Sequence, residues 1–140
     1  MLQNGVVQSF CGVGPIITNG AIDASRISGY DLDTDGARNV IGYDAEMNYY
    51  ILTCSAEITG EAGLTPTEAA DILLDLGVIE AYMMDGGGSV STTVNGEKIN
   101  HNIDSSGTTD RPVSTALYVQ KVDKQSITNA NLQMALINNT

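Results

Sequence analysis

The sequence predicts an α+β fold, in which one main helix packs on a mixed, largely antiparallel sheet. Two Asn-Gly pairs, Asn19-Gly20 and Asn95-Gly96, lie between runs of apolar and β-branched residues, and such pairs are typical of two-residue hairpin turns. Between them, Thr65-Pro66-Thr67-Glu68 has the start signals of a helix, a capping box with proline at the first helical position. Strands joined by tight turns pair antiparallel, so a sheet with one helix follows.

The helix is expected to run from Pro66 to Leu76. Gly77 follows at the position where a residue in the left-handed conformation commonly ends a helix. Apolar residues recur at helical spacing and predict one stripe that faces the sheet. The residues of this stripe are Ala69, Ile72, Leu73 and Leu76.

Apolar and β-branched runs predict the strands. In chain order these runs are Gly5–Cys11, the two arms of a hairpin within 14–22, Ala37–Asp44, Asn48–Cys54, Val78–Met84, a second hairpin within 90–100, and Asp110–Val119. The chain has 140 residues, which suits a single core. Residues 1–122 are expected to form one domain, and residues 123–140 a polar tail or short helix.

The charge of the chain restricts its partners. The formal net charge is −11, and only six residues are lysine or arginine. A protein that binds nucleic acid or an anionic membrane needs a basic surface, so neither partner is expected. No stretch is apolar and long enough to span a bilayer. An anionic substrate would have to be met by one or two arginines and by backbone N–H groups.

The most informative stretch is Asp85-Gly86-Gly87-Gly88-Ser89, which directly follows the apolar run of the strand Val78–Met84. A buried strand that ends here would deliver the Asp85 carboxylate to the edge of the sheet. The glycines leave room for a ligand, and successive N–H groups in such a turn can form a concave anion site. The alternative is a flexible turn in which Asp85 bonds its own backbone.

Two arginines are the candidate cationic partners of this stretch. Arg38 and Arg111 each stand at the start of a predicted strand, and Asp85 stands at the end of one. In antiparallel neighbours, the start of one strand lies beside the end of the other, so these residues are expected to meet at one sheet edge. The alternative is that each arginine pairs on the surface with a carboxylate near it in sequence, Asp35 or Asp110.

A second acidic segment resembles the beginning of a calcium loop. Asp31, Asp33 and Asp35 alternate with other residues and are closed by Gly36, as in loops whose oxygens converge on Ca²⁺. The twelfth position is Gly42, where such a loop uses a bidentate glutamate. The segment therefore predicts either a Ca²⁺ site or three solvated aspartates, and no other cofactor is expected.

Five blocks in the right order resemble the phosphodiester glycosidase family. They are Phe10 with Gly14–Gly20, Ala37–Gly42, Gly63–Pro66 with the helix and Gly77, Asp85–Ser89, and Arg111–Val113. The departures are Asn39, where the family has threonine, and an interruption at 11–13. Family domains are also longer at the N-terminus, so the resemblance implies either that another chain, or a second copy in a homo-oligomer, completes the fold, or that the fold is trimmed.

The resemblance implies hydrolysis of a glycosyl phosphodiester, with a glycan or sugar phosphate as substrate. Asp85, Arg38 and Arg111 would then be the catalytic residues. Gly86, Gly87, Gly88 and Ser89 would bind the substrate. Two alternatives keep the same fold: a non-catalytic carbohydrate-binding domain, and a structural domain of a bacterial virus particle, such as a decoration, tail or fibre protein. Both alternatives favour an extracellular or virus-particle location over the cytoplasm.

Overall fold

The computed structural model describes residues 10–23, 25, 34–56, 60, 62–101, 108–119 and 121. The chain divides into two units. The first contains Met1–Cys11 and Pro112–Thr140, and its described residues form no helix or strand. The second, Gly12–Arg111, contains all the named elements. No described helix has the length and apolar character needed to cross a membrane.

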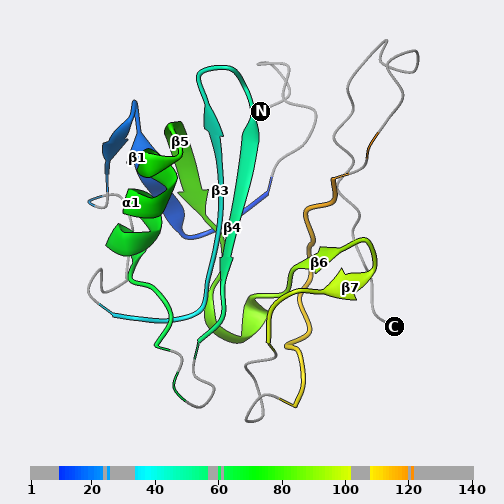
Figure 1. Ribbon diagram of the computed structural model, residues 1–140. Coiled ribbons are helices and arrows are strands. Elements are labelled where there is room, and N and C mark those ends of the chain that lie inside the picture. The colour runs from blue at the N-terminus through cyan, green and yellow to red at the C-terminus, as the bar shows by residue number, and fades with distance from the viewer. Residues whose placement is uncertain are drawn as a thin grey trace. The chain divides into compact units, whose positions relative to one another are not determined.

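The second unit is built around a five-stranded sheet with the strand order β2-β1-β5-β3-β4. Its strands are β1 (Gly14–Thr18), β2 (Ala21–Ile22), β3 (Arg38–Asp44), β4 (Tyr49–Cys54) and β5 (Val78–Met83). Every pairing between them is antiparallel. The helix α1 (Pro66–Asp75) packs on one face of this sheet (Figure 1). The predicted α+β class, with a largely antiparallel sheet and one packed helix, is therefore confirmed.

Both predicted hairpin turns are present. Asn19 and Gly20 have φ of 53° and 72° and connect β1 to β2. Asn95 and Gly96 have φ of 52° and 86° and connect β6 (Thr93–Val94) to β7 (Glu97–Lys98), a separate two-stranded sheet. Positive φ at both central positions gives the turn the twist of its flanking strands, which is why the Asn-Gly pair identifies it.

The helix begins as the sequence predicts. The Thr65 hydroxyl accepts a hydrogen bond from the Glu68 N–H at 3.1 Å, and the Glu68 carboxylate accepts one from the Thr65 N–H at 2.9 Å. Each of these bonds satisfies an N–H group that the first helical turn leaves without a partner. The helix ends at Asp75, and Gly77 follows with φ of 86°.

The buried face of α1 differs from the predicted stripe. Ile72 and Leu76 are 41% and 54% exposed. The residues that pack on the sheet are Pro66, Ala69, Ala70 and Leu73. Both sets obey helical spacing and share two members, so periodicity could not choose between them. The small side chains of the two alanines let the helix lie against the core, and this leaves the two larger residues on its flank.

One predicted strand lies mostly outside the described residues, and another is not found. Residues 5–9 lie outside the described part of the chain, and the described Phe10 and Cys11 are not in a strand. Residues 110–119 are described and form no strand, and Val113, Tyr118 and Val119 are exposed. A β-branched run becomes a strand only where a neighbour pairs with it, and none of the described strands does so. The predicted tail at 123–140 lies outside the described residues.

The strand β4 forms one edge of the sheet. Its six residues include no lysine, acidic residue or proline, and its pairing with β3 runs without a bulge from Arg38↔Cys54 to Tyr43↔Tyr49. The side chains of Tyr49 and Ile51 are 65% and 50% exposed. These properties leave β4 without the features that usually protect an edge strand from pairing with another chain.

The turn between β3 and β4 is held by Asp44, a carboxylate that is nearly completely buried. It accepts hydrogen bonds from the N–H groups of Glu46 and Asn48, the Asn48 side-chain amide and the Tyr50 hydroxyl, at 2.8–3.0 Å. The hydrogen bond from the Asn48 side chain is the main cause that lowers the pKa of Asp44, against the opposing effect of desolvation. The charged form is therefore the one that stabilises the turn.

Replacing Asp44 by asparagine is expected to lower the stability of the protein in a pH-dependent way. Because the pKa of Asp44 is lower in the folded than in the unfolded state, its contribution is complete above the ordinary carboxyl pKa. It is lost as the pH falls through the lowered value. Urea unfolding should therefore show a difference between wild type and Asp44→Asn that is largest at neutral pH and shrinks in acid. Asp71→Asn, at an exposed helix position, removes the same charge as a control. A difference that is independent of pH would contradict this account.

Candidate functional site

The glycine-rich stretch leaves the end of β5 beside the start of β3. The register pairs Met83 with Val40, and the N–H of Met84 donates to the carbonyl of Asn39 at 2.8 Å. Asp85 is the second residue after the last residue of β5. The backbone arrangement that the sequence predicts for Asp85 and the first residues of β3, a strand end beside a strand start, is therefore present.

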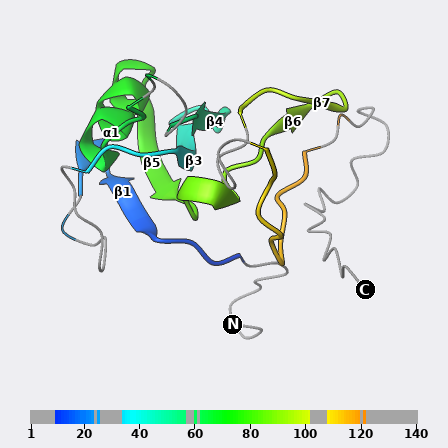
Figure 2. The same ribbon diagram turned by 90° about the horizontal axis from the view of Figure 1, so that it is seen from below.

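The glycine loop, defined here as residues 85–89, contacts two further segments through its backbone. The N–H of Gly87 donates to the carbonyl of Ala37 at 3.1 Å, just before β3. The carbonyl of Gly88 accepts from the N–H of Arg111 at 3.4 Å. Gly87–Ser89 form a short 3₁₀ helix, the turn that follows β5 in Figure 2. Three segments that are far apart in sequence thus meet at this loop.

The N–H groups of the loop are not all available to a ligand. The N–H of Gly86 donates to the Asp85 carboxylate at 3.0 Å, and the N–H of Gly87 is used by Ala37. The N–H of Ser89 donates to the carbonyl of Gly86 at 3.2 Å. Gly88 is buried, and no hydrogen bond of its N–H is found within the described part of the chain. In this structure the N–H groups of Gly86 and Gly87 thus have protein acceptors, and a role of the three glycines in binding substrate stays a prediction.

Asp85 itself is exposed. One oxygen of its carboxylate accepts the hydrogen bond from the N–H of the next residue, Gly86, and this bond holds the carboxylate at the start of the glycine loop. The alternative that the sequence left open, a turn in which Asp85 bonds its own backbone, is thus observed. It does not exclude a chemical role, because a carboxylate oxygen can accept more than one hydrogen bond.

Arg38 is a buried arginine, and its side chain is only 4% exposed. Its Nε donates to the carbonyl of Leu64 at 2.9 Å and its Nη2 to the carbonyl of Thr34 at 2.6 Å. The alternative of a surface arginine is therefore wrong. The bond to Leu64 holds the start of β3 against the segment before α1, where Gly36 and Leu64 also form an antiparallel bridge, and the bond to Thr34 stays within the segment before β3. A role of Arg38 in binding phosphate stays a prediction.

Arg111 is exposed, and its backbone is the part that contacts the loop. The neighbouring carboxylate, Asp110, forms an ion pair with Lys98 at the end of β7. Arg111 therefore directly follows a carboxylate whose charge is balanced by Lys98. A role of the Arg111 guanidinium in binding phosphate stays a prediction.

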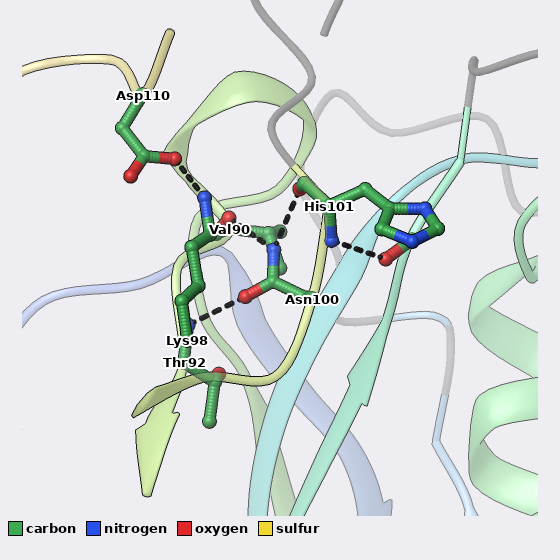
Figure 3. A network of polar contacts seen from close by, with 7 residues as sticks. Val90, Thr92, Lys98, Asn100, His101 and Asp110 are labelled. Carbon is green, nitrogen blue, oxygen red and sulfur yellow. Dashed lines mark hydrogen bonds and ion pairs between the residues drawn. The ribbon is translucent and has the colours of Figure 1, made fainter. Parts of the chain in front are cut away.

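A small core lies beside the loop and was missed by the sequence analysis. It consists of Ala37, Ala56 and Val90, all buried. Asn100, which is 8% exposed, stands next to it with hydrogen bonds to three backbone groups (Figure 3). Nothing in the sequence distinguishes Asn100 from the other polar residues around the second hairpin, so only its burial identifies it.

The predicted calcium segment falls largely on undescribed residues. Asp31 and Asp33 lie outside the described part, and Asp35 is exposed. Among the described residues, no group of three or more His, Cys, Asp or Glu side chains is placed to hold a metal ion. The Ca²⁺ site stays a prediction.

Two sequence comparisons identify relatives. The sequence pattern of the phosphodiester glycosidase family matches residues 2–120. An uncharacterized protein derived from the SPbeta prophage of Bacillus subtilis strain 168, YomE, is 28% identical over 102 residues. This match covers 72% of the present chain and 16% of YomE.

Two solved structures are similar. The catalytic domain of zebrafish N-acetylglucosamine-1-phosphodiester alpha-N-acetylglucosaminidase, auto-inhibited by its pro-peptide, matches with a TM-score of 0.57 at 23% identity. The match covers 65% of this chain and 34% of that one, and it shows a shared fold. A hypothetical protein from Synechocystis matches with a TM-score of 0.50 at 30% identity, over 61% of this chain and 17% of that one. The matches thus cover between 16% and 34% of the length of these three proteins.

Proposed function

Because this chain belongs to the phosphodiester glycosidase family, we propose that it hydrolyses a glycosyl phosphodiester at the bond between the anomeric carbon of the sugar and the phosphate oxygen. The observation that carries the proposal is the glycine loop. This loop has an exposed carboxylate at one end, a buried N–H without an acceptor in the described chain at Gly88, and an arginine bonded to it through the backbone.

The chemistry of the reaction matches these groups. Water adds to the anomeric carbon, the bond to the phosphate oxygen breaks, and a free sugar and a phosphomonoester leave. The transition state has positive charge on the sugar, which the Asp85 carboxylate would stabilise, directly or as the base that takes the proton of the water. The negative charge that develops on the leaving phosphate would be met by the N–H of Gly88 and by a guanidinium, whose planar fork matches two phosphate oxygens.

The proposal is tested by incubating the purified full chain with an N-acetylglucosamine-1-phosphodiester and with diesters of other sugars. The first of these substrates is the one in the name of the zebrafish protein. Release of both the free sugar and the phosphomonoester is the expected result. If no diester of the panel is hydrolysed above the rate of the Asp85→Asn variant, the proposed activity is excluded for the isolated chain.

Replacing Arg111 by alanine is expected to weaken turnover of the diester while the fold persists. The guanidinium would bind the phosphate, and a hydrogen bond to a charged group contributes about 1.5–3 kcal/mol, so kcat/KM should fall by about ten- to a hundredfold. Lys121→Ala removes the same charge from another exposed residue and serves as control. Equal kcat/KM values for wild type and Arg111→Ala would remove Arg111 from the site.

A second candidate is a glycan-binding or structural domain of a virus particle. It is favoured by the prophage origin of YomE. In that case the loop would retain sugar phosphate without cleaving it. Calorimetric binding of the diester without product release would select this function, and the symmetry of the protein in solution would show whether it assembles.

A further inference from the structure

The side-chain amide of Asn100 forms three hydrogen bonds with the backbone, in which its oxygen accepts one and its NH₂ group donates two. Its Oδ1 accepts from the N–H of Thr92 at 2.7 Å. Its Nδ2 donates to the carbonyl of Val90 at 2.8 Å and to the carbonyl of His101 at 2.9 Å. Figure 3 shows the Asn100 amide with its hydrogen bonds to the backbone of Val90, Thr92 and His101. An amide side chain has one acceptor atom and one NH₂ group with two donors, and each of these takes part here.

These bonds act on the segment that leaves the glycine loop. Val90 directly follows Ser89, and its N–H donates to the carbonyl of Gly87 at 3.1 Å. Its side chain is buried with Ala37 and Ala56, and the carbonyl of Ala37 in turn binds the N–H of Gly87. Asn100 therefore holds a residue that contacts Gly87 by two routes, one through its N–H and one through the small core.

The second hairpin could not hold this segment by itself. β6 and β7 have two residues each, and beyond them the Ile99 N–H donates to the carbonyl of Thr92 at 3.0 Å, while the hydroxyl of Thr92 hydrogen-bonds that of Thr53 in β4 at 2.7 Å. A two-stranded hairpin is marginally stable in water. Where regular strand pairing has ended, the amide of Asn100 supplies hydrogen bonds to the N–H of Thr92 and to the carbonyl of Val90.

We propose that Asn100 is a positioning residue of the glycine loop: it fixes Val90 and thereby the placement of Gly87, Gly88 and Asp85. Its structural part is independent of the activity, and its part in turnover rests on the proposed function. Neither an aspartate nor an aliphatic residue suits this place, because an aspartate would turn acceptor oxygens toward two carbonyls and an aliphatic residue would supply none of the three hydrogen bonds. Buried polar groups without partners are costly.

The structural part is tested by amide hydrogen exchange on the full chain. Asn100→Asp keeps the size of the side chain but removes both donations. Asn95→Asp makes the same change in the turn of the same hairpin, where aspartate is also accepted before glycine. Exchange of the Val90 N–H group, which lies in the segment that the lost donations hold, is expected to be at least about tenfold faster in Asn100→Asp and unchanged in Asn95→Asp. Unchanged exchange in a folded Asn100→Asp protein would overturn the proposal.

A second variant keeps the proposal testable if the first one does not fold. If Asn100→Asp does not fold, Asn100→Ala removes the bonds without placing a charge beside the carbonyls, and the same exchange result is expected of it. Failure of both variants to fold, while Asn95→Asp folds normally, would overturn the assignment of a local positioning role, because Asn100 would then be needed for the whole fold.

The catalytic part is tested with the diester that wild type hydrolyses. A small displacement of reacting groups is costly, so kcat of the Asn100 variant should fall by at least about tenfold. Asp44→Asn destabilises the turn at the opposite end of β3 and should leave kcat unchanged below its melting temperature. A wild-type kcat in the Asn100 variant, despite faster exchange of the loop, would overturn the catalytic part. If wild type hydrolyses no diester, the proposed function fails, and hydrogen exchange still decides the role of Asn100.

Discussion

Asp85→Asn is expected to abolish hydrolysis of a glycosyl phosphodiester and to leave the melting temperature nearly unchanged. The structure supports both halves of this result. Asp85 is exposed, and the one hydrogen bond found for its side chain within the described residues comes from the Gly86 N–H. An asparagine oxygen can accept the same bond, so the loop should keep its shape. The negative charge that the reaction needs would be lost.

The size of the effect separates a chemical from a binding role. Loss of a group that transfers a proton typically costs about 10²- to 10⁴-fold in rate, whereas loss of a binding contact would mainly raise KM. Asp75→Asn, at the exposed end of α1, removes the same charge at a distance from the loop in sequence and is the control. A kcat of Asp85→Asn within a few-fold of wild type would show that another group performs the chemistry.

Gly63→Ala is expected to have the largest effect on stability. Gly63 has φ of 89°, a conformation that alanine adopts only with strain, and a Cβ at this position would lie 2.4 Å from the carbonyl oxygen of Gly36. The contacting atom belongs to the backbone and cannot move aside without breaking the bridge between Gly36 and Leu64. Strain and overpacking together should cost about 2–5 kcal/mol of the free energy of unfolding.

A neighbouring glycine provides the matched control. Gly60 has nearly the same φ, 91°, but a Cβ there would meet no atom within 4 Å. Gly60→Ala should therefore show the conformational strain alone, about 1–2 kcal/mol. Urea unfolding of both variants measures the difference. Equal destabilisation would mean that the close approach of the segments at Gly36 and Gly63 contributes nothing, and the bridge would then not be a fixed part of the fold.

The parts of the fold that the sequence predicts correctly depend on neighbours in the chain. The turns at Asn19-Gly20 and Asn95-Gly96 follow from the positive φ that these residues tolerate. The start of α1 follows from the reciprocal bonds of Thr65 and Glu68, three residues apart. The end of β5 at the glycine loop was predicted for the same reason, since an apolar run gives way to an acid and three glycines.

The features that the sequence could not decide depend on residues far away in the chain. The alternative of a surface arginine at Arg38 is wrong, because this residue is buried and its Nε donates to the carbonyl of Leu64, 26 residues later. The buried face of α1 depends on which side chains the sheet can accommodate, and Ile72 therefore lies outside it. In the loop, the sequence predicts the Gly87 N–H as a donor to a ligand. In the structure this N–H donates to the carbonyl of Ala37, a partner that no local sequence pattern indicates.

The unprotected edge at β4 has a consequence for how the protein must be handled. The strand carries no charge of its own, so we expect repulsion between copies to come from the net charge of −11 on the chain as a whole. Mutual repulsion of this kind is colloidal: it disappears near the isoelectric point, about 4.1, and it is screened within about 10 Å at 0.1 M salt. Solubility should therefore fall in mild acid or concentrated salt well before the core unfolds. The acidic composition should thus reduce pairing of β4 with other copies, and buffers of neutral pH and low ionic strength should maintain this repulsion.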